Sequence, residues 1–101
     1  MPRVLKREAA RLGLVAQWVW YAENASVDVA DRFLEAVEET LVLLSGQPEI
    51  GKALVTRKPE LQGMRWFRVA RGYDKILLFY FPREHAVELV RVIHGSRGAR
   101  C

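Results

Sequence analysis

Apolar residues recur at helical spacing along the first half of the chain. Within residues 8–24 they follow one face of a helix, which predicts an amphipathic helix. The residues of this face are Leu12, Val15, Ala16 and Val19. The aromatic side chains of Trp18 and Tyr21 widen it.

The strongest periodic signal lies in residues 26–46, where apolar residues again follow one helical face. These residues are Ala30, Phe33, Leu34, Val37, Leu41 and Leu44. Ser26 is a candidate N-cap, and Ser45-Gly46 followed by Pro48 ends the pattern. Because the break between the two helices is short, they are predicted to form an antiparallel hairpin.

Three apolar segments separated by short polar turns make up the last third of the chain. They are Met64–Val69, Lys75–Phe81 and Ala86–Ile93, and their aromatic and β-branched residues predict strands. We expect Pro82 to end the middle strand. The connections are a few residues long, which favours antiparallel pairing in a meander.

Residues along the third strand should alternate between the two faces of the sheet. One face is predicted to carry Val87, Leu89, Arg91 and Ile93, and the other Glu88, Val90, Val92 and His94. One face should pack on the helices, and the other is expected to be partly open.

The remaining segments complete the order of elements. Pro2–Lys6 fits either an edge strand or a disordered lead-in, and residues 48–63 are predicted to be loop, with a short turn or strand near Ala53–Val55. Helices precede the strands, so the class is α+β, in β-α-α-β-β-β order, with a small, mostly antiparallel sheet and a two-helix hairpin packed on one face. The length predicts a single domain, residues 1–101, with residues 95–101 as a flexible tail.

Charge is distributed unevenly along the chain. The net charge is +4, and residues 52–101 include eleven Lys and Arg residues but only four Asp and Glu residues. The positive charge therefore belongs to the predicted sheet and tail, which permits binding to nucleic acid or to an acidic protein.

Composition also excludes several classes of protein. The single cysteine, Cys101, can form no internal disulfide and fits a reducing cytoplasm, and no apolar run approaches a membrane span. Two histidines and one terminal cysteine do not have the spacing of metal ligands, so no metal site is expected. No phosphate-binding glycine loop is present, and no cofactor is expected.

Five short motifs, in their order and spacing, resemble the RelE/ParE superfamily of bacterial toxins over nearly the whole chain. They are Ala30-x-x-Phe33, Leu44-x-x-x-Pro48-x-x-Gly51, Phe67-Arg68-Val69 before Gly72-Tyr73, Phe79-Tyr80, and Arg91-Val92-Ile93-His94-Gly95-x-Arg97. The last motif is similar to the ParE branch.

The resemblance implies the toxin of a type II toxin–antitoxin pair. Such a toxin forms a hetero-oligomer with a small ParD-like antitoxin, which wraps around it, and it contacts operator DNA only through that antitoxin. The ParE branch is associated with inhibition of DNA gyrase. The alternative is the RelE branch, whose members cut messenger RNA on the ribosome, and a third reading is an inactive relic with the same fold.

RNA cleavage needs a proton acceptor, a proton donor and cations around one phosphate. The candidate catalytic residues are His94 and Arg97. His94 is the candidate general base, because the pKa of histidine suits that role, and Arg97 could supply positive charge. The ribonuclease pattern favours lysines where this chain has Arg65 and Phe67, and the residues after 94 include no tyrosine. The sequence therefore favours a ParE-like inhibitor that acts by binding. It favours His94 as a strand-end residue that orders the tail, with catalysis or contact with the target as the alternatives.

Two groups of residues are candidates for binding the antitoxin or the target. Arginines from the strands and their ends are expected to converge on a cluster that attracts carboxylates or phosphates. They are Arg65, Arg68, Arg71, Arg91 and Arg97, and the alternative is pairing within the chain, for example Arg91 with Glu88. The second group is Trp18, Trp20 and Tyr21, which cannot all face one core, so at least one is expected to be exposed or at an interface. These side chains fit either the core or a groove that binds the antitoxin or a second copy of the chain.

Overall fold

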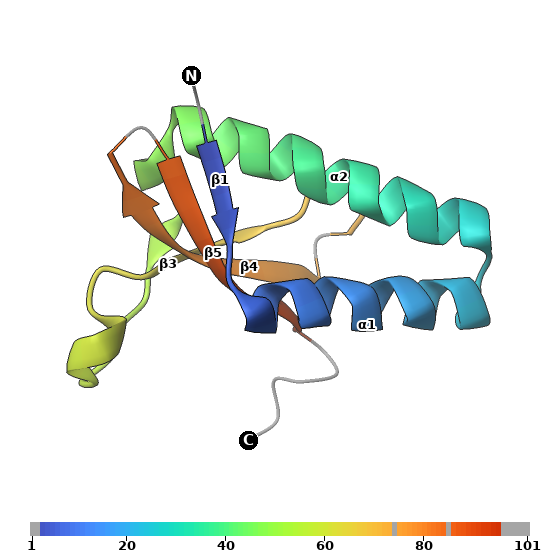
Figure 1. Ribbon diagram of the computed structural model, residues 1–101, viewed down its shortest axis with the longest axis horizontal. Coiled ribbons are helices and arrows are strands. Elements are labelled where there is room, and N and C mark those ends of the chain that lie inside the picture. The colour runs from blue at the N-terminus through green and yellow to red at the C-terminus, as the bar shows by residue number, and fades with distance from the viewer. Residues whose placement is uncertain (1–2, 74, 85, 96–101) are drawn as a thin grey trace.

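Two helices lie side by side on one face of a five-stranded sheet (Figure 1). The structure is a computed structural model that describes residues 3–73, 75–84 and 86–95. Its elements are β1 (Arg3–Lys6), α1 (Glu8–Asn24), α2 (Val27–Gly46), the 3-10 turn η1 (Pro48–Ile50), β2 (Lys52–Ala53), the 3-10 turn η2 (Pro59–Leu61), β3 (Arg65–Arg68), β4 (Ile76–Arg83) and β5 (Ala86–His94).

The sheet has the strand order β1-β5-β4-β3-β2. β2, β3, β4 and β5 pair antiparallel with their neighbours, and β1 pairs parallel to β5. The α+β class, the hairpin, the meander and the strand before the first helix are therefore confirmed.

Local sequence explains where the helices begin and end. The Ser26 hydroxyl caps α2 by accepting a hydrogen bond from the Val29 N–H at 3.1 Å, as predicted. Asp28 in the first turn of α2 and Glu8 in that of α1 complement the helix dipoles. Within the described residues, neither helix is long and apolar enough to cross a membrane.

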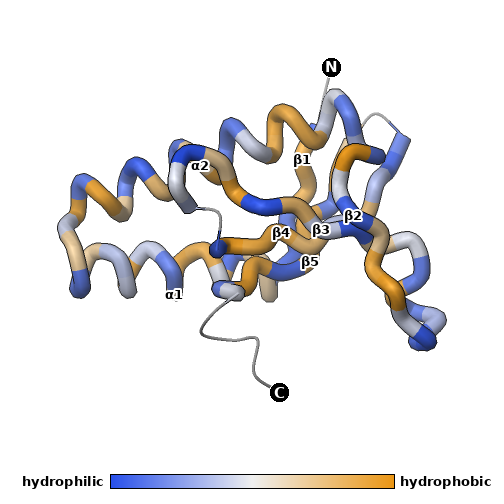
Figure 2. The backbone as a smooth tube through the Cα atoms, turned by 180° about the vertical axis from the view of Figure 1, so that it is seen from behind, coloured by the Kyte–Doolittle hydropathy of each residue, from blue (hydrophilic) through white to orange (hydrophobic). Residues whose placement is uncertain are grey.

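The core lies between the hairpin and the sheet. Its largest fully buried apolar side chains are Phe33, Val37, Leu41 and Leu44 of α2, Val69 after β3, Ile76, Leu78 and Tyr80 of β4, and Val87 and Leu89 of β5. The middle strand, β4, is almost continuously apolar, as suits a strand at the centre of a sheet (Figure 2).

The buried Tyr80 hydroxyl fixes the loop after α2. It donates to the Pro48 carbonyl at 2.7 Å and accepts from the Gly51 N–H at 3.1 Å. A side chain at position 51 would collide with this hydroxyl, so only glycine fits there.

Pro82 does not end the middle strand, contrary to expectation. β4 runs through Pro82 to Arg83, and Pro82 pairs with Val87 of β5. The pairing of β3 with β4 ends at Tyr80, so Pro82 lies where β4 has no neighbour on its β3 side. A proline is tolerated at such an edge position because no ladder hydrogen bond is lost there.

The predicted alternation along the third strand is also wrong beyond Leu89. Phe79 pairs with Arg91 and Tyr80 pairs with Leu89, so Val90 is the extra residue of a β-bulge. The bulge exchanges the faces of the residues that follow. Val87, Leu89, Val92 and His94 consequently face the helices, whereas Glu88, Arg91 and Ile93 face away from them.

The apolar stripe of α1 faces solvent over much of its length. Leu12 and Val15 are each 60% exposed and Val19 is 39% exposed, whereas Ala10 and Leu14 are buried. Gly13 lies against β5, where an added Cβ would be 3.1 Å from the Val92 carbonyl oxygen. Small residues thus bring α1 close to the sheet and leave the apolar stripe on the outside.

Candidate functional site

The face of the sheet opposite the helices, here called the helix-free face, combines aromatic and cationic side chains. The pairing registers place one row across four strands of this face. The row consists of Lys52, Trp66, Phe79 and Arg91. Arg68 lies two residues after Trp66 on the same strand and therefore on the same face.

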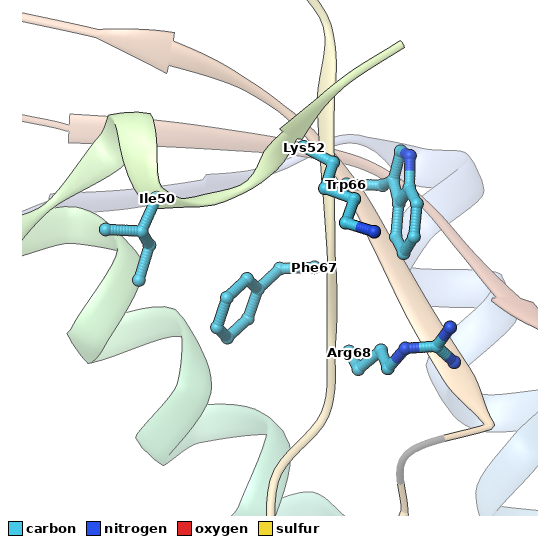
Figure 3. A pocket seen from close by; sticks show the side chains of 5 residues that line it. All are labelled: Ile50, Lys52, Trp66, Phe67 and Arg68. Atoms are coloured by element: carbon cyan, nitrogen blue, oxygen red, sulfur yellow. The ribbon is translucent and has the colours of Figure 1, made fainter.

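A hollow of about 230 Å³ lies at one end of this row, at the edge of β3. It is lined by Ile50, Lys52, Trp66, Phe67 and Arg68, and we call it the β3-edge pocket (Figure 3). The Lys52 ammonium lies 5.4 Å from the centre of the Trp66 ring, and the Arg68 guanidinium carbon lies 5.6 Å from it. Both distances are those of cation–π contacts, so the indole holds two positive charges in place.

A second hollow, of about 290 Å³, lies further along the helix-free face. The sheet contributes Phe79, Val90, Arg91 and Ile93 to it, and the loop between β2 and β3 contributes Leu54, Leu61 and Met64. Its lining is apolar apart from Arg91, which is exposed. The bulge explains this position, because without the shift at Val90 the side chain of Arg91 would face the helices.

Glu88 is the one acidic residue in the described strands, and two arginines hold it. Its carboxylate accepts from Arg7 at 2.5 Å and from Arg83 at 2.6 Å, and both guanidinium groups lie over the Phe81 ring. These hydrogen bonds lower the pKa of Glu88 below its usual value. The predicted alternative partner of Glu88 was Arg91, which is instead found beside the second hollow.

Of the five arginines of the predicted cluster, the four within the described residues do not converge. Arg68 and Arg91 share the helix-free face. Arg65 lies on the other face of β3, where its guanidinium donates to the backbone carbonyls of Glu49 and Gly51 at 3.1 and 2.7 Å. Arg71 forms an ion pair with Glu39 of α2 at 3.0 Å, and Arg97 lies outside the described residues.

His94 lies on the helix side of β5, where it pairs with the buried Ile76. Its ring centre is 6.4 Å from that of Trp20 on α1. Neighbouring strand positions alternate, and Arg91 is three residues earlier, so Arg91 and His94 lie on opposite faces of the sheet.

The three aromatic residues of α1 have different environments. Tyr21 packs inside the molecule, with its ring centre 5.3 Å from that of Phe33 and 5.4 Å from that of Tyr73. Trp18 donates its indole N–H to Asp31 of α2 at 3.0 Å. Trp20 is 38% exposed and contacts Tyr21 edge to face. The sequence-based expectation of at least one surface aromatic is therefore met by Trp20.

The outer side of the hairpin carries an apolar surface, here called the α1 ridge. It consists of Leu12, Val15, Val19 and, across a shallow groove, Leu34 of α2. Residues 12–22 of α1 include no charged side chain. A surface helix normally carries charges on its solvent side, so the ridge is typical of a surface that another protein covers.

Sequence reasoning missed Lys52 as a candidate, because it lies in a segment predicted to be loop. The sequence does indicate a short strand beside it, at Ala53–Val55. Only the pairing of Lys52 with Trp66 shows that the Lys52 side chain lies on the helix-free face. Within residues 3–73, 75–84 and 86–95, no three His, Cys, Asp or Glu side chains are grouped so that they could hold a metal ion.

Two solved structures have a similar fold. The chain superposes on a chain of the chromosomal ParDE toxin–antitoxin system of P. aeruginosa with a TM-score of 0.71 and 15% identity, covering 93% of this chain and 96% of that one. It also superposes on a conserved hypothetical protein of Helicobacter pylori, with a TM-score of 0.54 and 14% identity, covering 95% and 97% of the two chains. None of the curated proteins matches the sequence.

The family model described as the ParE toxin of type II toxin–antitoxin systems, parDE, matches residues 4–98. The chain therefore belongs to the ParE toxin family, and the fold and family implied by its sequence motifs are confirmed.

Proposed function

We propose that this ParE-family toxin acts by binding DNA gyrase and blocking it, and not by cutting RNA. The observation that carries the proposal is the separation of Arg91 and His94 on opposite faces of the sheet. A ribonuclease must bring a base and cations to one phosphate, and a histidine and an arginine on opposite faces of the sheet are not arranged in this way.

The other cations support binding in preference to cleavage. Arg65 and Arg71 are engaged by the backbone of the η1 segment and by Glu39, respectively. Lys52 and Arg68 lie against Trp66, and both lie on the face of the sheet opposite to that of His94. Charged and aromatic side chains on an exposed sheet face are suited to recognising another protein.

The α1 ridge supports neutralisation by a ParD-like antitoxin. Permanent complexes use interfaces that are more apolar than transient ones, and the ridge offers an uncharged, apolar helix surface for an amphipathic antitoxin segment. Trp18 and Trp20 flank the ridge and serve as anchors in this complex, whereas operator DNA is reached only through the antitoxin. Toxin, antitoxin and gyrase would meet in the cytoplasm.

The test uses the purified chain, freed from its antitoxin, in two assays. We expect it to inhibit DNA supercoiling by gyrase, to leave ribosome-bound messenger RNA intact, and to lose its effect when antitoxin is added. His94→Ala should inhibit gyrase as the wild type does, provided that thermal unfolding shows an intact fold. Cleavage of the message with normal supercoiling would overturn the proposal in favour of a ribonuclease, and absence of both effects would indicate an inactive relic.

A further inference from the structure

The spacing of the α1 ridge is that of a seam between two helices. Leu12, Val15 and Val19 follow one another at steps of three and four residues, and Ala22 continues the series by a further step of three. Apolar residues at such steps line the contact between helices that pack side by side. α2 and β5 contact α1 on its other sides, so the seam is open to a further helix.

A groove beside the seam has room for a side chain of that further helix. Its volume is about 260 Å³, and it is lined by Leu14, Val15, Trp18 and Leu34. The surface therefore has projecting apolar side chains with a hollow next to them. Such a surface can bind a copy of itself about a two-fold axis, because each copy provides the contacts that it receives.

The uncharged part of α1 has opposite charges at its two ends. Residues 12–22 include no Asp, Glu, Lys or Arg, Arg11 comes directly before them and Glu23 directly after. Both of these side chains are exposed. At 1.5 Å of rise per residue they lie about 18 Å apart along the helix, so they cannot meet within one copy.

We propose that the toxin, when it is free of antitoxin, pairs with a second copy of itself through the α1 ridge. The two α1 helices run antiparallel about a two-fold axis. Val15 of each copy lies against Val19 of the other, and the same register sets Leu12 against Ala22. This inference goes beyond the proposed function and does not depend on it.

Charge complementarity favours a second copy as the occupant and the antiparallel direction. In the register that pairs Val15 with Val19, Arg11 of each copy lies level with Glu23 of the other, so opposite charges meet at both ends. Antiparallel packing also sets the positive end of each helix dipole beside the negative end of the other. A parallel pair would bring like charges together at each end.

The net charge of the chain indicates where two copies can approach. Each copy carries +4, so two copies repel each other overall, and the repulsion is least where the meeting surfaces carry no charge. The ridge is such a surface. Because the contact is only one helix wide, it is smaller than a standard protein interface, and we expect a weak dimer that forms as the concentration rises.

Sedimentation equilibrium of the free toxin over a range of concentrations tests the pairing. We expect the mass to rise from one chain to two. Arg11→Glu and Glu23→Arg should each weaken dimerisation by about tenfold, because like charges then meet twice in every dimer. Arg57→Glu is the control, since it makes the same change of net charge as Arg11→Glu at an exposed position after β2, and it should dimerise within about twofold of the wild type.

A mixture of the two ridge variants gives the sharpest test of the register. In the mixed dimer the introduced glutamate faces the introduced arginine, and the native Glu23 faces the native Arg11. We therefore expect the mixture to dimerise with wild-type strength although each variant alone does not. Partial unfolding or a general effect of net charge cannot produce this recovery, because each copy keeps its own substitution, and thermal unfolding of both variants should match the wild type.

Several outcomes would overturn the inference. A toxin that stays monomeric at every concentration, with antitoxin binding weakened by Leu12→Ala, would assign the ridge to the antitoxin alone. Dimers that are equally strong in both charge variants would place the contact on another surface, and a mixture that dimerises no better than its components would exclude the antiparallel register. The proposed function is tested separately: antitoxin that fails to dissociate a confirmed dimer would contradict the proposed antitoxin contact and leave the pairing intact, and the supercoiling assay decides on gyrase.

Discussion

The α1 ridge and the helix-free face of the sheet are both exposed, and they differ in chemistry. The ridge is an uncharged helix surface of leucine and valine side chains. The helix-free face mixes aromatic rings with Lys52, Arg68 and Arg91, and its acid, Glu88, is held by two arginines.

The difference indicates that one small domain can offer two kinds of interface without overlap. Apolar surface gives affinity that is insensitive to salt, whereas exposed charges give orientation and fast association that salt weakens. A toxin that must be stored with one partner and released onto another would use both. The predictions below test this contrast from its largest expected effect to its smallest.

Two leucines on α1 provide a matched pair. Leu14 is 8% exposed and packs in the core, whereas Leu12 is 60% exposed on the ridge. We expect Leu14→Ala to lower the free energy of unfolding by about 2–4 kcal/mol, because it leaves a cavity, and Leu12→Ala by about 0.5 kcal/mol or less. Urea unfolding of the free toxin measures both values.

Antitoxin affinity completes the comparison of the two leucines. Leu12→Ala should weaken antitoxin binding by about tenfold, as expected for loss of an apolar contact in an interface. Equal losses of stability in the two variants would mean that the ridge is part of the core. Unchanged antitoxin affinity in Leu12→Ala would remove the ridge from the antitoxin interface.

Substitution of Tyr80 measures how much a buried hydroxyl on the helix side of the sheet stabilises the fold. Tyr80→Phe removes a hydroxyl that bonds to Pro48 and Gly51, and we expect a loss of about 1–2 kcal/mol in the free energy of unfolding. Burial raises the pKa of Tyr80, so the folded state favours the neutral phenol. The stabilisation of the folded state by Tyr80 is therefore complete below the ordinary tyrosine pKa. It is lost as the pH rises from there through the higher pKa of the folded protein.

Denaturant titrations of wild type and Tyr80→Phe at neutral and strongly alkaline pH would measure this difference. The gap in stability between the two proteins should shrink at alkaline pH. A constant gap would show that ionisation of Tyr80 does not contribute, and a negligible gap at neutral pH would show that the two hydrogen bonds do not fix the loop.

The elements of this fold could be predicted because their signals are local. The spacing of apolar residues in α2 and the cap at Ser26 depend on residues within a few positions of one another. The same holds for the breaks at Asn24 and Gly46, where both helices end as predicted.

The orientation of the elements could not be predicted, because it depends on distant residues. α1 is apolar on two sides, and the approach of Gly13 to Val92 decides which side faces the sheet. The face that carries Arg91 depends on the bulge at Val90, which arises only when β5 pairs with β4. Residue types therefore identified candidate side chains, while pairing across the sheet decided which of them lie together.

Substitution of Glu88 has the smallest expected effect on stability, and it concerns the charged end of the helix-free face. Arg7 and Arg83 lower the pKa of the Glu88 carboxyl, so the ionised form stabilises the folded state. That contribution is present above the ordinary glutamate pKa and is lost as the pH falls through the lower pKa of the folded protein. We expect Glu88→Gln to cost about 0.5–1 kcal/mol at neutral pH, a modest value because the arginines are half exposed and screened by water.

The pH dependence of the stability difference shows whether Glu88 acts through its ion pairs with Arg7 and Arg83 or through packing alone. Thermal unfolding of the wild type and Glu88→Gln should converge as the pH falls into the acid range, and added salt should narrow the gap at neutral pH. A gap that is independent of both pH and salt would mean that Glu88 acts through packing against Phe81. In that case the two arginines would remain available to an acidic partner, and the charged part of the helix-free face would extend beyond the β3-edge pocket to this end of the sheet.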